Sequence, residues 1–556
     1  MSITEALLEK GVIKPEHLAH AMELRKSDGV RLDKALVKLG YVSEQALLGE
    51  MGEQLSIPLV DLTTAEIDVE TLRSLPPKLV FRKHLVPLAR NNGALTLATS
   101  DPSDLYAFDE VRLLTGLEVT PALAPQDEID RVIKTHYGIG GSTIDEMMST
   151  DDLEVIDNGE QDNEDLLEMA QEASVIKLVN EIFLEALDER ASDIHIEPYE
   201  HDLVIRYRID GVLQRASVPP QIRRFQAAII SRIKIMAKMN IAEKRVPQDG
   251  RINLQVGGRQ VDVRVSVIPM LFGEGVVMRL LDKSNLLFKL TDLGMDDGTF
   301  GVFRELIKRP HGIVLVTGPT GSGKTTTLYA ALQEIVRPEI KVLTVEDPVE
   351  YNLGGVNQVQ VQEKVGMTFA RGIRHMLRHD PDVVMVGEIR DIETAEAAIQ
   401  AALTGHLVFS TLHTNDACSA ATRLLDMQLE PYLVTSTLEA AMAQRLVRTI
   451  CPHCKEPYEP DQDSLPSDFE LDDDAVLYRG AGCRQCRGTG YHGRCGLFEL
   501  MPVDDDIRQL IMSSAPVGEV VRTARRNGMH MLREDGWAKV RAGVTTPEEV
   551  IRSTKA

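Results

Sequence analysis

Short apolar segments and longer helical patterns alternate through the second half of the chain. Four segments rich in Val, Ile and Leu are too short for helices, at 313–316, 341–345, 383–386 and 407–410. Segments of this kind are typical of strands buried on both faces of a parallel sheet. Residues 327–332 follow the first strand and have the composition of a helix. We therefore predict an α/β domain with a parallel sheet over residues 291–450.

A different pattern precedes this domain. Apolar residues at i, i+3, i+4 and i+7 predict a helix over 175–187, and alternation over 203–215 predicts two strands that turn at Asp210-Gly211. A second hairpin turns at Gly257-Gly258. Because side chains alternate along a strand, Arg206 and Arg208 share one face. We expect an α+β domain with an antiparallel sheet over 169–290. Its arginine face is either solvated or offered to the phosphates of a neighbouring subunit.

The N-terminal region contains an internal repeat. Ala6–Ile13 returns 29 residues later as Ala35–Val42, and in both copies a helix is expected to end at glycine. A hairpin over 85–98 and helices near 103–115 and 126–137 follow, so residues 1–138 form helices plus a small α/β part. Residues 139–168 are acidic and are predicted to form an extended flexible linker. Helices are expected again over 501–556.

Composition limits the classes of function. With 556 residues, three or four domains are expected. The net charge of −24 argues against non-specific nucleic-acid binding and favours a basic protein partner. The sequence shows no apolar run of 18 residues and no secretory signal, so we expect a cytoplasmic protein.

One glycine-rich segment carries the clearest chemistry. It matches G-x-x-x-x-G-K-[ST], in which backbone N–H groups surround phosphates, the lysine reaches the β- and γ-phosphates, and the hydroxyl binds Mg²⁺. Lys324 and Thr325 take the last two roles, and the segment predicts binding of ATP or GTP. The predicted nucleotide-binding residues are Gly318, Pro319, Thr320, Gly321, Ser322, Gly323, Lys324, Thr325 and Thr326.

Acidic residues follow the next two strands along the chain. Glu346, Asp347 and Glu350 come after strand 341–345, and Gly387-Glu388 comes after strand 383–386. Parallel sheets carry their chemistry at the carboxyl ends of strands, so these acids are catalytic candidates. Gly387 occupies the position where an Asp usually lies, which leaves Glu388 as the acid. His413, after the fourth strand, is a candidate for sensing the γ-phosphate, while His406 is expected to cap or pack.

Cysteine spacing indicates a metal. Two C-x-x-C pairs are separated by twenty-eight residues. Four thiolates fill a tetrahedral Zn²⁺ site and leave no open position, so this zinc would be structural, with redox dithiols as the alternative. The expected module spans 451–500, and its ligands are Cys451, Cys454, Cys483 and Cys486.

Taken in order, the motifs at 318–326, 344–350, 380–390 and 405–417 resemble the Walker A, Asp box, atypical Walker B and His box of secretion ATPases. Residues 242–251 and the four cysteines resemble the type II secretion and type IV pilus assembly branch. The resemblance implies a homohexamer with a RecA-like core. It implies that Glu350 is the general base, that Glu388 supports Mg²⁺, and that Arg208, with Arg223 as a second candidate, supplies an arginine finger.

The same resemblance implies an ATP-driven motor that assembles pilin or pseudopilin filaments. It would work peripherally at the inner membrane with a platform protein and a cytoplasmic docking subunit. The N-terminal repeat resembles a domain that binds cyclic di-GMP through Arg-Leu-Gly motifs. Here the second copy reads Arg31-Leu32-Asp33, which favours protein docking over cyclic di-GMP.

Three alternatives to an assembly motor are weighed. A nucleic-acid translocase would need a basic, aromatic-bearing channel, and only 4% of the residues are aromatic. A docking module without turnover does not account for Glu350 and Glu388. A pilus retraction motor, by resemblance, lacks both the N-terminal region and the cysteine pairs.

Overall fold

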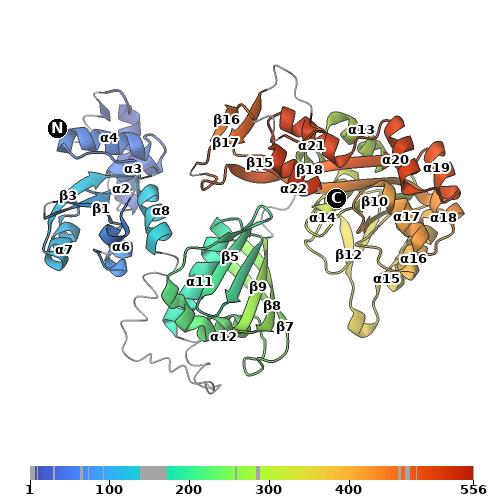
Figure 1. Cartoon of the computed structure of the whole chain (residues 1–556), viewed down its shortest axis with the longest axis horizontal. Helices are drawn as coiled ribbons and strands as arrows, with labels where there is room; N and C mark the ends of the chain where they lie inside the picture. Colours follow the sequence, from blue (N-terminus) through green and yellow to red (C-terminus); the bar gives the residue numbers. More distant parts are fainter. Residues whose placement is uncertain are drawn as a thin grey trace. The chain divides into compact units, whose positions relative to one another are not determined.

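The computed structural model describes residues 7–8, 10–28, 32–62, 67–72, 74–91, 93–137, 172–256, 259–282, 289–460, 465–469, 476–483 and 485–554 (Figure 1). The chain divides into two compact units, Met1–Leu280 and Leu281–Ala556. Within the described residues, no helix combines the length and the apolar character that crossing a membrane requires. The predicted linker over 139–168 and the Gly257-Gly258 turn lie outside the described residues, as does Arg31.

The N-terminal repeat forms the same turn twice. Gly11 and Gly40 have positive φ angles of 69° and 72°. After each glycine the next backbone N–H donates back to a leucine carbonyl, from Val12 to Leu7 and from Tyr41 to Leu36. The helices are α2 (Pro15–Asp28), α3 (Leu32–Lys38) and α4 (Glu44–Leu55). The Ser43 hydroxyl caps α4 by accepting a hydrogen bond from the Ala46 N–H.

A three-stranded sheet of order β1-β2-β3 follows the repeat. The predicted hairpin is β1 (Val86–Asn91) with β2 (Ala94–Thr99), and β3 (Glu118–Leu123) pairs parallel to β2. The sequence did not predict β3, which contains Pro121 and only three apolar residues besides it. The helices of this part are α5 (Val69–Leu72), α6 (Pro77–Lys83), α7 (Leu105–Thr115) and α8 (Gln126–Tyr137).

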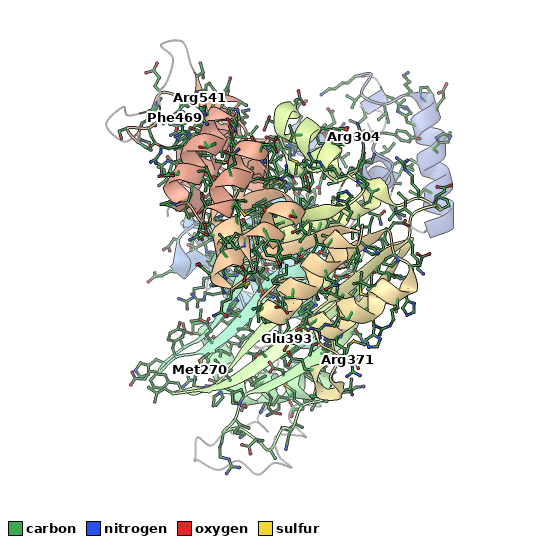
Figure 2. All side chains as sticks on the ribbon, turned by 90° about the vertical axis from the view of Figure 1, so that its right-hand side faces the viewer. Met270, Arg304, Arg371, Glu393, Phe469 and Arg541 are labelled. Atoms are coloured by element: carbon green, nitrogen blue, oxygen red, sulfur yellow. The ribbon has the colours of Figure 1, made fainter. Side chains whose placement is uncertain are left out.

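Residues 172–282 form a helix-covered sheet with the strand order β6-β5-β4-β9-β8-β7. Helix α11 (Ala173–Asp188) buries its apolar stripe in the same core as Ile205 and Tyr207, while Arg206 and Arg208 lie on the other face of their strand. Met270 ends β8 near the exposed connection to β9 (Figure 2). The remaining elements are β4 (Asp193–Pro198), β5 (Leu203–Ile209), β6 (Val212–Arg215), η1 (Pro220–Phe225), α12 (Gln226–Met236), β7 (Gln248–Val256), β8 (Arg259–Met270) and β9 (Gly273–Asp282).

The second unit is built on a seven-stranded sheet of order β12-β11-β13-β14-β10-β15-β18. Its first six strands pair in parallel, and β18 pairs antiparallel to β15. Four strands were predicted, and the sheet confirms a mixed α/β fold with parallel strands. The strands are β10 (Gly312–Thr317), β11 (Val342–Glu346), β12 (Val356–Gln360), β13 (Val383–Val386), β14 (Leu407–Leu412), β15 (Leu438–Ile450) and β18 (Tyr491–Pro502).

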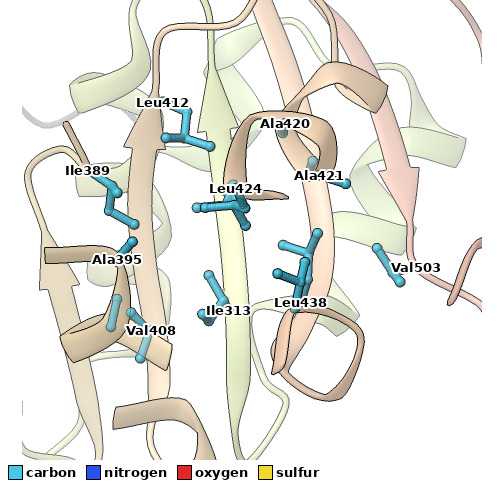
Figure 3. Close-up of a cluster of buried hydrophobic side chains, with 14 of the residues drawn as sticks. Ile313, Ile389, Ala395, Val408, Leu412, Ala420, Ala421, Leu424, Leu438 and Val503 are labelled. Atoms are coloured by element: carbon cyan, nitrogen blue, oxygen red, sulfur yellow. The ribbon is translucent and has the colours of Figure 1, made fainter. Parts of the chain in front are cut away.

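Two apolar cores lie on the opposite faces of this sheet. Alternation along β10 sends Ile313 and Leu315 to one core and Val314 and Val316 to the other. Figure 3 shows the first core, where Leu424 approaches the sheet. Its helices include α15 (Phe369–Met376), α16 (Ile392–Leu403), α17 (Cys418–Asp426) and α18 (Pro431–Thr437), and the other core contains η2 (Leu290–Leu293), α13 (Asp297–Leu306) and α14 (Lys324–Ile335).

The cysteine segment lies between the last two strands of this sheet. Strand β18 belongs to the large sheet, although the sequence placed most of it in a module ending at residue 500. A small two-stranded sheet, β16 (Lys455–Tyr458) with β17 (Leu477–Gly480), lies between β15 and β18 in the sequence. Helices α19 (Asp505–Met512), α20 (Val517–Arg526), α21 (Leu532–Arg541) and α22 (Pro547–Thr554) end the unit. The Arg541 guanidinium lies 5.4 Å from the Phe469 ring centroid, which ties α21 to this segment (Figure 2).

Candidate active site

The glycine-rich loop connects strand β10 to helix α14, as the motif requires. Gly318, Gly321 and Gly323 have positive φ angles, and Lys324 is the first residue of the helix. A strand, a loop and a helix N-terminus in this order present N–H groups and partial positive charge to an anion. The Ser322 hydroxyl oxygen is buried and has no hydrogen-bond partner within the described structure. The loop therefore fits phosphate groups, and the nine predicted nucleotide-binding residues lie in the loop and the first turn of α14.

Two of these glycines are required by close packing against β15. A Cβ atom on Gly318 would lie 2.6 Å from the Gln444 carbonyl oxygen, and one on Gly323 would lie 2.8 Å from Gln444 Nε2. Both distances are shorter than a carbon atom tolerates. The Gln444 side chain also accepts a 2.8 Å hydrogen bond from the Thr327 hydroxyl of α14. Gln444 thus packs against both ends of the loop.

Lys324 is bound by the loop itself. Its Nζ atom donates to the carbonyl oxygens of Gly318 and Pro319, at 2.8 and 3.0 Å. Burial lowers the pKa of Lys324 to about 8; the Glu388 charge opposes this effect and the Arg445 charge adds to it. An anion placed in the loop would favour the charged form of the lysine.

The acids at the carboxyl end of β11 have different environments. Glu346 is buried, and its carboxylate accepts hydrogen bonds from Thr344 Oγ1, the Tyr329 hydroxyl and Gln358 Nε2. Burial and the Glu346 charge raise the pKa of Tyr329 well above its usual range. Glu350 is only half-buried, and its backbone N–H hydrogen-bonds to the Tyr329 hydroxyl. Glu346 is therefore part of a buried polar network, whereas Glu350 is partly exposed.

Glu388 and His413 lie together, as two acid–base groups at adjacent strand ends. His413 Nε2 is 3.1 Å from one Glu388 carboxylate oxygen, and Arg390 Nη2 is 2.6 Å from the other. The Glu388 side chain is 13% exposed and that of His413 is 46% exposed. Hydrogen bonding to Glu388 raises the pKa of Arg390. Gly387 is packed, since a Cβ atom there would lie 3.3 Å from the Phe369 ring and 3.4 Å from the Glu346 Cα.

Several residues of this site carried no assigned role in the sequence analysis. Arg390 lies inside a recognised motif, and its opposite charge two residues after Glu388 was the signal that could have identified it. Gln444 and Arg445 carry no local signal, because their strand was not predicted. His406 caps as expected, since its Nδ1 atom lies 2.9 Å from the Ala401 carbonyl oxygen at the end of α16.

The arginines proposed as fingers belong to the first unit and have partners there. Arg208 Nε is 3.6 Å from an Asp193 carboxylate oxygen, and Arg208 Nη1 donates to the Gly211 carbonyl oxygen at 3.1 Å. Arg223 donates to Gln226 Oε1 and to the Glu200 carbonyl oxygen. Either arginine would have to exchange these contacts to act on a nucleotide.

The four cysteines of the two C-x-x-C pairs converge. Their sulfur atoms all lie within 4.8 Å of one another, with 3.7 Å between Cys451 and Cys483 and 3.6 Å between Cys454 and Cys486. Tetrahedral zinc with bonds of ~2.3 Å places its sulfur ligands about 3.8 Å apart. The cluster fits a closed Zn²⁺ site, whose chemistry would be structural. Cys418 is buried away from it and contacts Met529.

A phosphate loop in a mostly parallel sheet, with acids at the ends of neighbouring strands, defines a P-loop nucleotide hydrolase. Comparison with known proteins identifies the family within this class. The profile of the Type II/IV secretion system proteins matches residues 168–552, and that of the MshEN domain matches residues 55–143. The chain belongs to the Type II/IV secretion system protein family, a family of ATPases, which confirms the resemblance of its motifs.

Two relatives match over nearly their whole length. The type IV pilus assembly ATPase PilB of Myxococcus xanthus is 44% identical over 558 residues, which cover 99% of this chain and 98% of the relative. The type II secretion system protein E of Xanthomonas campestris pv. campestris is 45% identical over 563 residues, which cover 100% of this chain and 98% of the relative. The ATPase DotB of Yersinia pseudotuberculosis shares the fold, with a TM-score of 0.50 and 23% identity over 68% of this chain and 93% of that chain.

Proposed function

We propose that the protein is a hexameric motor that hydrolyses ATP to assemble pilin or pseudopilin filaments. The observation that carries the proposal is the arrangement of four parallel strands in the order β11-β13-β14-β10. Their carboxyl ends carry Glu350, Glu388, His413 and the Lys324 loop. Phosphate binding, charge stabilisation and a general base are thereby supplied at one edge of a RecA-like sheet.

Each residue at this edge has a proposed role. Lys324 and the loop amides bind the phosphates. The Thr325 hydroxyl and Glu388, directly or through water, would hold Mg²⁺, which would neutralise phosphate charge. One Glu388 oxygen also contacts Arg390 and the other contacts His413. Glu350 accepts a proton from the attacking water. His413 contacts the γ-phosphate region and links it to Glu388, and Arg208 or Arg223 comes from a neighbouring subunit to stabilise charge.

The partners and the location follow from the family. The relatives bear the names of a pilus assembly ATPase and a type II secretion protein, which supports a cytoplasmic motor at the inner membrane. We propose that residues 1–138 bind a docking subunit, that the motor moves a platform protein, and that nucleic acid is not a partner. Protein docking is favoured over cyclic di-GMP, because Asp33 replaces the glycine of the Arg-Leu-Gly motif.

Steady-state hydrolysis by the purified protein tests this function. The wild type should release phosphate from ATP in the presence of Mg²⁺, and Lys324→Ala should lose both nucleotide affinity and turnover. Arg423→Gln, which removes an exposed charge from α17, is the matched control and should behave as the wild type. Absence of hydrolysis by assembled wild-type protein would refute the motor.

A further inference from the structure

Gln444 and Arg445, on strand β15, pack against the phosphate loop. Arg445 lies on β15 next to the loop strand β10, and its Nη1 atom would lie 3.0 Å from a Cβ atom on Gly318. That nitrogen donates to the Gln444 carbonyl oxygen at 3.0 Å, the same oxygen that excludes a side chain at Gly318. The guanidinium therefore lies directly against the first glycine of the loop.

The other side of the same guanidinium holds a second segment. Arg445 Nη2 donates to the Asn415 carbonyl oxygen at 2.8 Å and lies 3.3 Å from Asn415 Oδ1. Asn415 is two residues after His413, in the connection between β14 and α17. Arg445 thus joins strand β15, where it packs against the phosphate loop, to the segment that contains His413.

That segment is also fixed at its far end. The Ala417 N–H donates at 2.8 Å to the buried carboxylate of Glu499 on β18. The Thr317 hydroxyl, just before the phosphate loop, donates to the Asp416 carbonyl oxygen at 3.4 Å. Between the strand end at Leu412 and the anchor at Ala417, Arg445 makes the only side-chain contact to Asn415 recorded within the described structure.

The contacts of Arg445 with Gln444 and Asn415 depend on the shape of its side chain rather than on ion pairing. Within the described residues Arg445 forms no ion pair, and burial lowers its pKa, although the charges of Glu499 and Asp416 oppose this effect. A guanidinium presents separate nitrogens in a rigid plane, and two of them here serve two chain segments. The single nitrogen of a lysine cannot reach both segments at once.

We propose that Arg445 is a positioning residue for hydrolysis, which holds His413 in register with the phosphates by clamping its segment to β15, where the phosphate loop packs. This inference rests on the proposed function, because it assigns work to His413 and Glu388. The loop would still bind nucleotide without the clamp, since its amides and Lys324 are intact. Only the transition state, which needs the groups in exact register, would lose stabilisation.

Steady-state kinetics with full-length protein separate this role from simple support of the fold. Arg445→Gln should lower kcat by about 10- to 100-fold, the scale for a misplaced catalytic group, and change KM by less than about threefold. Arg445→Lys keeps the positive charge but not the two separate guanidinium nitrogens, so its kcat should fall nearly as far as that of Arg445→Gln. Full activity in Arg445→Lys would overturn the clamp, and so would a loss confined to KM.

A double variant tests the link to His413. If both residues act as a unit, Arg445→Gln should add less than about threefold to the loss already caused by His413→Ala. Losses that multiply would contradict the proposal. Arg423→Gln is again the matched control, because it removes a guanidinium from the helix that follows the same segment.

Amide hydrogen exchange tests the clamp without requiring hydrolysis. In the wild type, ADP with Mg²⁺ should slow exchange in peptides that cover both 318–325 and 412–417. In Arg445→Gln the protection should remain in the first segment and disappear from the second. Equal protection of both segments in the variant would refute the clamp, even if the wild type proved not to hydrolyse ATP. A wild type that hydrolyses ATP but shows no protection at 412–417 would also refute it.

Discussion

The Lys324 ammonium group lies 2.8 Å from the carbonyl oxygen of Gly318, so the phosphate-binding lysine is held by its own loop. This contact places the lysine in a partly buried position where its pKa falls to about 8. Because the folded-state pKa lies below the unfolded value of 10.5, the free folded protein binds fewer protons than the unfolded chain between about pH 8 and pH 10.5. The contribution of Lys324 to the stability of the free protein therefore rises with pH in this window.

Nucleotide binding should reverse this balance. Phosphate charge favours protonated Lys324, so binding above pH 8 must take up a proton, and affinity for ADP should fall by up to about tenfold per pH unit. Calorimetry at pH 7 and 8.5, in buffers of different ionisation enthalpy, measures this uptake. Lys324→Arg is the control, because its cation does not titrate and should abolish the uptake at pH 8.5. Equal proton uptake by wild type and Lys324→Arg would exclude the lysine as its source.

Glu350 and Glu346 should respond oppositely to the same substitution. Glu350→Gln should retain nucleotide affinity while kcat falls by about 10²–10⁴, the scale for a lost general base. Glu346→Gln disturbs a buried network instead, and should lower the free energy of unfolding by about 1–3 kcal/mol. ATP affinity, turnover and denaturant unfolding of both variants decide between them. Wild-type turnover in Glu350→Gln would remove Glu350 from the base role.

The sequence predicted those parts of the site that are local. The phosphate loop, the strands β10, β11, β13 and β14, and the cysteine pairs each carry their signal within a few residues. Strand β15 was missed because its sequence, LEAAMAQRLVRTI, has helix-forming composition. Its place between β10 and β18 overrides that propensity, since the strand completes the sheet and buries apolar residues on both faces. With the strand unrecognised, Gln444 and Arg445 could not be placed beneath the loop.

The sequence alone also could not show that Glu346 and Glu350 have different environments. Both lie at the carboxyl end of β11, and the sequence assigned three carboxylates to one site. Glu346 accepts hydrogen bonds from Tyr329 on α14 and Gln358 on β12. Only tertiary packing shows that the Glu346 carboxylate belongs to a buried hydrogen-bond network.

Removal of the zinc should lower the stability of the fold and leave nucleotide binding intact. Purified protein is expected to contain about one Zn²⁺ per chain, and Cys451→Ser/Cys454→Ser should contain none. Because a structural metal contributes to folding, this variant should melt at a lower temperature while keeping its affinity for ADP. Cys418→Ser removes a thiol outside the cluster and should retain the zinc. A disulfide with no metal in the wild type would reverse the assignment.

The last prediction concerns assembly and follows from the partners of Arg208. In the first unit this arginine lies near Asp193, which also binds Arg279 at 3.1 Å. Asp193 therefore keeps a cationic partner if Arg208 leaves it, and the exchange leaves no buried charge unpaired. If Arg208 serves the site of a neighbouring subunit, specific ATPase activity should rise with protein concentration as hexamers form. Arg208→Ala should abolish most of that rise with little change in ADP affinity, because a finger acts on transition-state charge.

Mixing two inactive variants tests whether the arginine acts between subunits. Arg208→Ala and Glu350→Gln each retain the group that the other lacks, so mixed hexamers should contain some complete sites and recover part of the turnover. Arg215→Ala is the matched control, since Arg215 lies on the neighbouring strand and pairs with Asp202 at 2.5 Å; it should remain active alone. If the mixed subunits co-assemble and turnover stays absent, Arg208 does not act in trans, and its pairing with Asp193 is its role.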